Sequence, residues 1–304
     1  MSEPAPGTET RCGFIAVIGA PNAGKSTLVN ALVGAKVSIV SHKVQTTRMP
    51  LRGIAIEGAS QLVFIDTPGI FAPRRRLDRA MVEAAWGGAG DADIVVLTID
   101  AAKGIEEDAD RILAKLQERK AAPILALNKI DRVKKERLLD LARDCNARLP
   151  FTATFMISAL SGDGVADLKS HLAHTVAPGP WHYPADEISD APLRVMAAEV
   201  TREKIFERLH DELPYQATVE TTAWQEKAKA VRIEQTIYVE RDSQKAIVLG
   251  HGGRTIKQLS MQARLELTQI LERPVHLFLF VKVRENWGDD PERYRDMGLA
   301  FPKD

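Results

Sequence analysis

Residues 19–26, GAPNAGKS, combine glycines, a lysine and a hydroxyl group in a pattern that binds phosphate. The glycines let backbone N–H groups turn inward around an anion, and the helix that follows adds partial positive charge at its N-terminus. Lys25 can reach the β- and γ-phosphates of a nucleotide, and the Ser26 hydroxyl can bind Mg²⁺. A chance match in a glycine-rich loop is the competing interpretation, at roughly one in a hundred for a chain of this length. The predicted phosphate loop consists of Gly19, Ala20, Pro21, Asn22, Ala23, Gly24, Lys25, Ser26 and Thr27.

A second motif, NKID at residues 128–131, points to the base that the nucleotide carries. The Asp131 carboxylate can accept from both N1–H and the 2-amino group of guanine, whereas adenine offers neither donor there. The stem of Lys129 can lie over the face of the base. The ISAL stretch at residues 157–160 ends a later apolar run, and its backbone N–H groups can donate to guanine O6. The predicted base site consists of Asn128, Lys129, Asp131, Ser158, Ala159 and Leu160.

Two further stretches have the residue types that sense a terminal phosphate. DTPG follows an apolar run, so that Asp66 can hold Mg²⁺ through water and the Gly69 N–H can contact the γ-phosphate. VQTTR, residues 44–48, lies in the long connection before that run. A threonine there can bind Mg²⁺ and the γ-phosphate, which orders the loop only with triphosphate bound. We expect Thr47 in this role, with Thr46 as the alternative. The predicted sensing loop is Asp66, Thr67, Pro68 and Gly69, and the predicted metal ligands are Ser26, Thr47 and Asp66.

One residue departs from the best-known GTPase pattern. The position after DTPG often carries a glutamine that orients the attacking water, whereas this chain has Ile70, which cannot form a hydrogen bond. The motif therefore leaves open what holds the water.

A third kind of site is predicted in the second half of the chain. GHGG, residues 250–253, lies between two helical patterns, as does the G-x-x-G loop that clamps nucleic-acid backbone in KH domains. Residues 227–264 hold eight Lys or Arg and three acidic residues, so the basic character is local. An ordinary helix–helix turn is the alternative. The predicted RNA-binding residues are Lys245, Gly250, His251, Gly252, Gly253, Arg254 and Lys257.

The elements that position these motifs form two patterns. In the first half, near-continuous apolar strands alternate with helical stretches, which indicates a mostly parallel sheet covered on both faces. In such a sheet the ligand lies at the carboxyl ends of the strands. The predicted strands are 13–19, 61–66, 93–100, 123–129 and 152–158, and the predicted helices are 25–33, 79–87, 105–119, 134–148 and 164–175.

The second half reads helix, strand, strand, helix, helix, strand, which is a smaller α+β domain. The predicted order is a helix at 192–211, strands near 215–222 and 229–240, helices at 243–249 and 254–271, and the strand VHLFLFVKV at 275–283. Four prolines precede it in a stretch without periodicity, which favours a linker. The predicted organisation is a disordered N-terminus at 1–10, a nucleotide-binding domain at 11–177, a linker at 178–191, and a KH domain with a C-terminal tail at 192–304.

Composition narrows the class of protein. The 304 residues carry a formal net charge of zero and are 45% hydrophobic and 27% charged, as in soluble globular proteins. The apolar runs are too short to span a bilayer, and the polar first ten residues have no signal-peptide pattern. Cys12 and Cys145 have neither metal-site nor disulfide-framework spacing, so we expect buried thiols in a reducing cytoplasm.

Taken together, the motifs resemble one family. GAPNAGKS, QTTR, DTPG, NKID and ISA, followed by a linker and then ELPY, GHGGRTIK and VHLFLFVKVRENW, are similar in content and order to the bacterial GTPase family Era. The likeness covers about residues 13 to 300. It implies an α/β P-loop GTPase domain followed by a smaller α+β KH domain of type II. His251 departs from the pattern, since a lysine or another strongly basic or polar residue is frequent there.

The resemblance also implies partners and place. Such proteins bind and hydrolyse GTP with Mg²⁺, bind small-subunit ribosomal RNA near its 3′ end, and assist assembly of the small ribosomal subunit. They are cytoplasmic, with some association with the inner membrane surface, and we expect a monomer. The predicted catalytic residues are Lys25, Thr47, Gly69 and Asn22.

The role of Asn22 comes from a second resemblance. Several GTPases with an apolar residue after DTPG carry Asn at the fourth position of the phosphate loop, where its oxygen helps to bind K⁺ against the phosphates. That ion would offset charge in the transition state, and backbone groups of the two phosphate-sensing loops would place the water. Two alternatives remain: Asn22 bonds only within its own loop, or Gln45 swings in to hold the water.

Three functions therefore compete. The leading hypothesis is a GTP-hydrolysing switch that controls RNA binding. The second is an RNA-binding assembly factor in which the nucleotide is mainly structural. The third is a membrane-recruited regulator, which no lipidation signal or basic amphipathic helix supports.

Overall fold

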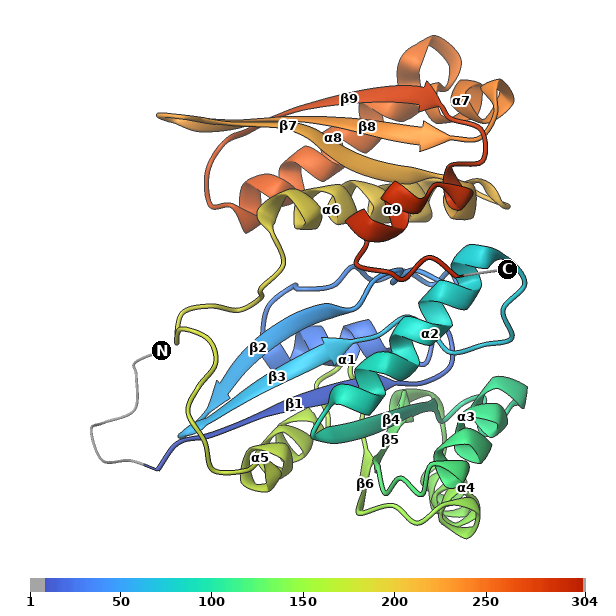
Figure 1. The fold of residues 1–304 in the computed structure, drawn as a ribbon, viewed down its shortest axis with the longest axis vertical. Helices are drawn as coiled ribbons and strands as arrows, with labels where there is room; N and C mark the ends of the chain where they lie inside the picture. Colours follow the sequence, from blue (N-terminus) through green and yellow to red (C-terminus); the bar gives the residue numbers. More distant parts are fainter. Residues whose placement is uncertain (1–8, 303–304) are drawn as a thin grey trace. The chain divides into compact units, whose positions relative to one another are not determined.

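The structure, a computed structural model, describes residues 9–302, and the chain divides into two compact units (Figure 1). Among the described residues, the first consists of residues 9–38, 47–190 and 297–302, and the second of Ile39–Thr46 and Ala191–Asp296. These units differ from the predicted domain ranges in three places: residues 39–46 group with the second unit, the predicted linker up to Asp190 groups with the first, and so do the C-terminal residues from 297. The predicted disordered segment, 1–10, lies almost entirely outside the described residues.

The first unit is a six-stranded sheet with helices on both faces. Its strands are β1 (Arg11–Ile18), β2 (Leu51–Glu57), β3 (Ser60–Asp66), β4 (Ile94–Asp100), β5 (Ile124–Asn128) and β6 (Ala153–Met156). Its helices are α1 (Lys25–Val33), α2 (Arg76–Asp91), α3 (Glu107–Glu118), α4 (Lys135–Arg148) and α5 (Val165–Thr175). The strand order is β2-β3-β1-β4-β5-β6, with β2 antiparallel and the others parallel. The predicted fold class is confirmed.

Side chains that alternate between the two faces of the sheet form two hydrophobic cores in the first unit, one on each face. In β1, Ile15 and Val17 pack against α1 and α5, whereas Ala16 and Ile18 pack on the opposite face against α2, α3 and α4. Successive strand residues point to opposite faces, so a strand buried on both sides must be apolar throughout. This explains why the strands read as continuous apolar runs.

The two cysteines differ in their surroundings. Cys145 lies on α4 and is buried in the core, as expected. Cys12, the second residue of β1, is only half-buried, and its thiol donates to Gln61 Oε1 over 3.6 Å. The prediction of a buried thiol is therefore confirmed for Cys145 and wrong for Cys12.

The sequence did not predict β2, the edge strand that pairs with β3 through a tight turn at Gly58. The predicted linker lies along this edge and is irregular but held in place. Ile54 N donates to Ile188 O over 2.9 Å, and Arg52 forms an ion pair with Asp190 at 2.9 Å. Gln61, buried at the start of β3, accepts from the backbone N–H groups of His182 and Tyr183. The linker residues up to Asp190 therefore belong to the first unit.

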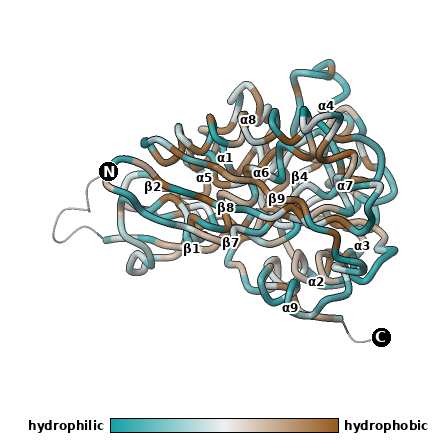
Figure 2. Tube along the Cα trace, turned by 90° about the horizontal axis from the view of Figure 1, so that it is seen from above, coloured by the Kyte–Doolittle hydropathy of each residue, from teal (hydrophilic) through white to brown (hydrophobic). Residues whose placement is uncertain are grey.

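The second unit has a three-stranded sheet, β7-β8-β9, covered on one face by helices. Its elements are α6 (Leu193–Arg208), β7 (Thr218–Lys227), β8 (Ala230–Val239), α7 (Asp242–Leu249), α8 (Arg254–Ile270), β9 (Val275–Val283) and α9 (Pro291–Asp296). β8 pairs antiparallel with β7 and parallel with β9. Up to β9 the order matches the predicted one. β9 is mostly brown in the hydropathy colouring of Figure 2, as expected for the apolar run VHLFLFVKV.

Short 3₁₀ turns connect several elements: Ile130–Arg132, Leu213–Gln216, His251–Gly253 and Trp287–Asp289. Helix α9 was not predicted, because its six residues are mostly charged and show no apolar periodicity. It is held instead by Arg293, whose Nη1 donates to Glu220 Oε2 over 2.6 Å, and by the fully buried Tyr294. Among the described residues, no helix combines the length and apolar content needed to cross a bilayer.

Candidate functional site

The predicted motifs of the first unit meet at one edge of its sheet. β1 runs into the phosphate loop, β3 ends at Asp66, β5 ends at Asn128, and the ISAL stretch follows β6. These strands are parallel to one another, so their carboxyl ends lie on the same side. Stretches separated by more than a hundred residues in sequence are thereby brought together.

Two glycines of the phosphate loop are required by the fold. Gly24 has φ of 92°, and a Cβ there would lie 2.3 Å from Asn128 Nδ2. A Cβ on Gly19 would lie 2.4 Å from the carbonyl oxygen of Thr98. Any side chain at either position would push the loop away from the neighbouring strand ends.

Lys25 is the buried cation of the phosphate loop. It is 6% exposed, and its ammonium donates to the carbonyl oxygens of Gly19 at 3.2 Å and Ala20 at 3.0 Å. Burial lowers the pKa of Lys25 to about 8, although the nearby Asp66 carboxylate acts in the opposite direction. The loop carbonyls offer only partial charge, so a bound phosphate would compensate this cation far better.

We expect nucleotide binding to be accompanied by proton uptake. With a pKa of about 8, Lys25 would take up about a quarter of a proton per site at pH 7.5 and about three quarters at pH 8.5, because phosphate restores its charged form. Titration calorimetry of GDP binding in buffers of different ionisation enthalpy measures this uptake. The nucleotide-free protein should also gain stability as pH rises from about 8 toward the lysine's ordinary value, since only the unfolded chain still holds the proton there. No proton exchange between pH 7.5 and about 8.5 would contradict the assignment.

Three oxygen-bearing side chains gather beside Lys25. Thr47 Oγ1 lies 2.9 Å from Ser26 Oγ and 3.4 Å from Asp66 Oδ2, and all three residues were predicted metal ligands. Asp66 is fully buried, and its Oδ1 has no hydrogen-bond partner among the described residues. Burial raises the pKa of Asp66, against the lowering effects of the Ser26 hydroxyl and the Lys25 ammonium. A buried carboxylate oxygen without a partner, next to two hydroxyls, fits a hard divalent cation such as Mg²⁺.

The threonine pair is separated by the fold. Thr46 turns its hydroxyl away from this cluster and donates to Lys43 O over 2.8 Å. Thr47 is 7% exposed and faces Ser26. Of the two alternatives, the geometry therefore favours Thr47.

The DTPG loop lies directly against the phosphate loop. Ile70 N donates to Gly19 O over 3.1 Å, and a Cβ on Gly69 would lie 3.0 Å from Pro21. Thr67 is fully buried and donates its hydroxyl to Val17 O over 2.8 Å, so its side chain supports the loop rather than facing a ligand.

Ile70 points away from the loop. It is 2% exposed and packs in the apolar core between the sheet and helices α2, α3 and α4. Its side chain therefore contacts neither a nucleotide nor a water beside one, and it cannot substitute for the glutamine of other GTPases.

Asn128 connects three predicted loops and is 2% exposed. Its Nδ2 donates to Ala23 O in the phosphate loop over 2.9 Å. Its Oδ1 accepts from the N–H groups of Lys129 at 2.8 Å and Ala159 at 2.9 Å. One amide thus fixes the phosphate loop, the NKID motif and the ISAL stretch relative to one another.

The predicted base reader is held by the ISAL stretch. The fully buried Ser158 donates its hydroxyl to Asp131 Oδ1 over 2.7 Å. Asp131 Oδ2 lies 3.8 Å from Arg132 Nε, and the Asp131 side chain is 33% exposed. Ser158 thus fixes one carboxylate oxygen of a side chain that solvent can still reach. Leu160 is 78% exposed.

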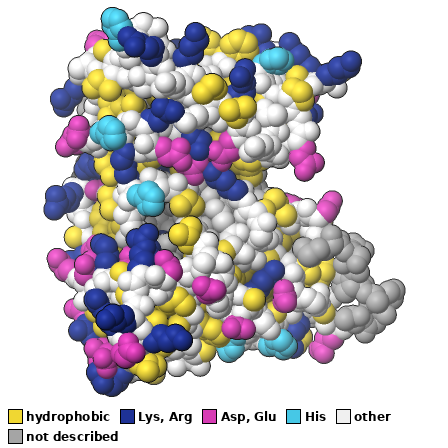
Figure 3. Space-filling view, turned by 180° about the vertical axis from the view of Figure 1, so that it is seen from behind, with side chains coloured by type: hydrophobic (Ala, Val, Ile, Leu, Met, Phe, Trp, Pro, Cys, Tyr) yellow, Lys and Arg dark blue, Asp and Glu magenta, His cyan; other side chains and the backbone are white. Residues whose placement is uncertain are grey.

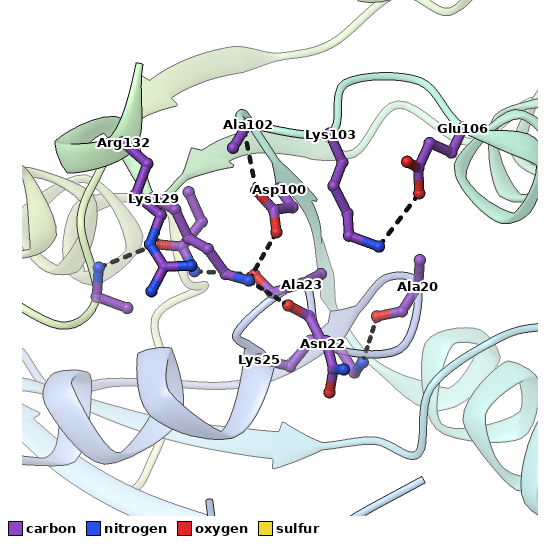
Figure 4. A network of polar contacts seen from close by, with 12 residues as sticks. Ala20, Asn22, Ala23, Lys25, Asp100, Ala102, Lys103, Glu106, Lys129 and Arg132 are labelled. Carbon is purple, nitrogen blue, oxygen red and sulfur yellow. Dashed lines mark hydrogen bonds and ion pairs between the residues drawn. The ribbon is translucent and has the colours of Figure 1, made fainter. Parts of the chain in front are cut away.

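Asp100, at the end of β4, is a site residue that the sequence analysis missed. Its Oδ2 lies 2.6 Å from the Lys129 ammonium, which also donates to Asn22 O over 2.6 Å. Figure 4 shows Lys129 reaching from the NKID motif across to both groups. Lys129 itself has φ of 67°, which directs its side chain back over the phosphate loop. An acidic residue at the end of a predicted parallel strand was the available signal.

The second unit presents the other predicted site. Gly250, Gly252 and Gly253 have φ of 70°, 60° and 75°, and a Cβ on Gly250 would lie 2.2 Å from Thr255 Oγ1. A Cβ on Gly252 would meet nothing within 4 Å, so this backbone is open to a ligand. His251, Arg254 and Lys257 are exposed, and Lys245 is half-buried. In Figure 3, Lys and Arg side chains recur over the upper part of the view, which belongs to this unit.

Comparisons with known proteins match a family model to part of each unit. A family model described as "50S ribosome-binding GTPase" matches residues 14–129, and one described as "KH domain" matches residues 212–288. The chain is 64% identical over 300 residues to a protein named GTPase Era from Bradyrhizobium sp. (strain BTAi1), covering 98% of this chain and 97% of the relative. It is 65% identical over 295 residues to GTPase Era of Rhizobium meliloti, covering 97% and 94%.

Solved structures give the same result. The fold matches that of a single-residue variant of Aquifex aeolicus Era bound to GDP and AlF4⁻, with a TM-score of 0.90 and 35% identity over 95% of this chain and 99% of that one. A structure of Era in complex with MgGDPNP and nucleotides 1506–1542 of 16S ribosomal RNA has the same TM-score, identity and coverage.

Proposed function

The chain belongs to the Era family of GTPases, and we propose that it is a guanine-nucleotide switch that binds small-subunit ribosomal RNA and assists assembly of that subunit. The specificity for guanine is supported by the Asn128 side-chain amide. It hydrogen-bonds both to the phosphate loop and to the NKID motif, so it fixes the position of Asp131 relative to the phosphate site. The RNA part is supported by the open glycine loop of the second unit and by the relative solved with a 16S ribosomal RNA fragment.

Each phosphate-site residue has a defined task in this proposal. Lys25 neutralises charge on the β- and γ-phosphates, and the Gly69 N–H donates to the γ-phosphate. The hydroxyls of Ser26 and Thr47 would bind Mg²⁺ directly, and Asp66 would do so through water. When bound, the metal would offset negative charge that develops on the phosphate oxygens. GTP and GDP thus differ by the group that Thr47 and Gly69 sense.

Because Ile70 is buried and cannot orient the attacking water, another group must assist the reaction, and K⁺ is the candidate. Asn22 has φ of 61° in the phosphate loop, and its carbonyl is held by Lys129. A K⁺ ion bound by the Asn22 side-chain oxygen and by carbonyls before Thr47 would offset transition-state charge as an arginine finger does. Backbone groups of the two phosphate-sensing loops would then place the water.

We expect K⁺ to raise GTP turnover relative to Na⁺, and Asn22→Ala to remove that difference while nucleotide still binds. Phosphate release measured at matched ionic strength tests this, with and without RNA. Equal rates in the two salts for the unaltered protein would eliminate the cation. Gln45→Ala would then be the next variant to measure.

RNA is the partner that distinguishes this function from a simple GTPase. In-cell crosslinking followed by sequencing of the bound RNA should recover the 3′ end of small-subunit ribosomal RNA. Crosslinks spread evenly over cellular RNA would contradict the proposal.

We further propose that the protein is cytoplasmic and monomeric and that it contacts the inner membrane surface. Liposome flotation with anionic vesicles tests the last of these. Ultracentrifugation at increasing concentration tests the monomer.

A further inference from the structure

Residues 39–46 lie between α1 and β2 in the chain, yet they belong to the second unit and not to the first. Their contacts run to helix α6. Val40 N donates to Glu203 Oε1 over 2.8 Å. The Lys43 ammonium donates to the carbonyl oxygens of Phe206 and Leu209, at the C-terminal end of the helix. Free carbonyls and the negative end of the helix dipole make this end a natural site for a cation.

Helix α6 has a run of three buried charged residues, two of which contact this segment. Arg202, Glu203 and Lys204 are 1%, 3% and 9% exposed. Consecutive helical residues point about 100° apart, so the sheet core alone cannot cover all three. Burial lowers the pKa of Lys204, but its hydrogen bond to Glu266 and the charge of Glu203 raise it overall. Buried charges persist only where they are paired or bound, and residues 39–46 supply part of that pairing.

Arg202 holds the last residue of the segment. Its Nε donates to Glu199 Oε1 over 2.7 Å, and its Nη2 donates to the carbonyl oxygen of Thr46 over 2.5 Å. The guanidinium also lies over the Phe206 ring at 5.3 Å, which leaves it little freedom. We call this set of contacts the α6 clasp: Val40, Lys43 and Thr46 on the segment, and Arg202, Glu203 and the end of the helix on the other side.

The clasp ends at Thr46, one peptide bond before Thr47, which belongs to the predicted metal-binding group of Ser26, Thr47 and Asp66. The carbonyl of Thr46 and the N–H of Thr47 share one rigid plane, so fixing one fixes the orientation of the other. Thr47 in turn faces Ser26 and Asp66. Two hydrogen-bonded anchors therefore meet at adjacent residues, one in each unit.

We propose that Arg202 and Lys43 are positioning residues for GTP recognition, holding residues 39–46 on α6 so that Thr47 meets the metal and the γ-phosphate. This rests on the proposed function and adds the residues that link the nucleotide to the RNA-binding unit. Because α6 is part of that unit, the proposal predicts that nucleotide state and RNA affinity are coupled. Linkage then requires that GTP changes RNA affinity by the same factor by which RNA changes GTP affinity.

The test uses the full-length protein with Lys43→Met, which keeps most of the apolar stem and removes the charge. Affinities for GDP and for a non-hydrolysable GTP analogue are measured with Mg²⁺ by fluorescent nucleotide titration. The expected result is a loss of about tenfold for the GTP analogue with GDP affinity unchanged, because only the triphosphate uses Thr47. Lys43→Arg should restore most of the loss, and Lys135→Met, an exposed lysine on α4, should behave as the unaltered protein.

Arg202→Lys provides the second arm, since it keeps the charge but loses the paired donors. It should also weaken the GTP analogue selectively, and in both variants the ratio of RNA affinities with GTP analogue and GDP should approach one. Equal weakening of both nucleotides, or no change in either, would overturn the proposal. If the unaltered protein binds no guanine nucleotide, the proposed function itself is wrong, and this outcome is distinguishable from failure of the positioning role alone.

Discussion

Asp131→Asn should weaken GTP binding by about 2–4 kcal/mol and raise affinity for xanthosine triphosphate. The carboxylate can accept two charge-assisted hydrogen bonds from guanine, and the loss of both has that magnitude. Ser158 donates to Oδ1 and fixes the side chain, so an amide here would present N–H groups to the base. The 2-amino group of guanine would then face the N–H groups of the introduced amide, donor against donor. The 2-oxo group of xanthine would instead accept a hydrogen bond from that amide.

Competition titrations with both nucleotides measure the exchange of specificity. Asp140→Asn on α4 is the matched control, because its carboxylate is 64% exposed and the charge change is identical. A variant that keeps full GTP affinity and ignores the xanthine nucleotide would show that Asp131 is not the base reader.

Gly252→Asp should abolish RNA binding and leave RNA-independent GTP hydrolysis near normal. The position has φ of 60° and open space around its Cβ, so the side chain projects where phosphate would approach the loop amides. Each lost hydrogen bond to a charged group costs about 1.5–3 kcal/mol, and repulsion adds to this. We expect a loss of affinity of at least about 30-fold, which corresponds to about 2 kcal/mol.

A suitable control for this variant exists in the first unit. Gly58 has φ of 59° and no neighbour within 4 Å of a built Cβ, so Gly58→Asp adds the same charge at the same backbone strain. It should bind RNA as the unaltered protein does, with affinity that falls as salt rises. Equal RNA binding by the unaltered protein and its Gly252→Asp variant would show that the GHGG loop is not the RNA-binding site.

Most of the scaffold followed from pattern alone. Continuous apolar strands and helical periodicity located β1, β3, β4, β5 and β6 and the five helices of the first unit within a few residues, because both faces of that sheet are buried. The motifs then fell at the strand ends, where parallel topology requires them to meet. The predicted loop residues that lie together in the structure, such as Ser26, Thr47 and Asp66, were found by residue type and order.

What the sequence missed depends on long-range contacts. Asp100 becomes part of the site only because Lys129 reaches it, and a single strand-terminal acid does not indicate its partner. The buried position of Ile70 follows from the direction of one side chain after a turn, which composition does not specify. The sequence placed a phosphate-sensing loop at residues 44–48 but not its hold on α6, since that hold uses backbone carbonyls that leave no sequence signature.

The central claim is that the chain hydrolyses GTP with its phosphate loop and does not merely hold a nucleotide. Phosphate release by purified protein with Mg²⁺ and K⁺, compared with a Lys25→Ala variant prepared identically, tests it most directly. We expect slow but clear turnover for the unaltered protein, and background release for the variant. Release at the same rate by both proteins would contradict the claim and leave the nucleotide a structural role in an RNA-binding assembly factor.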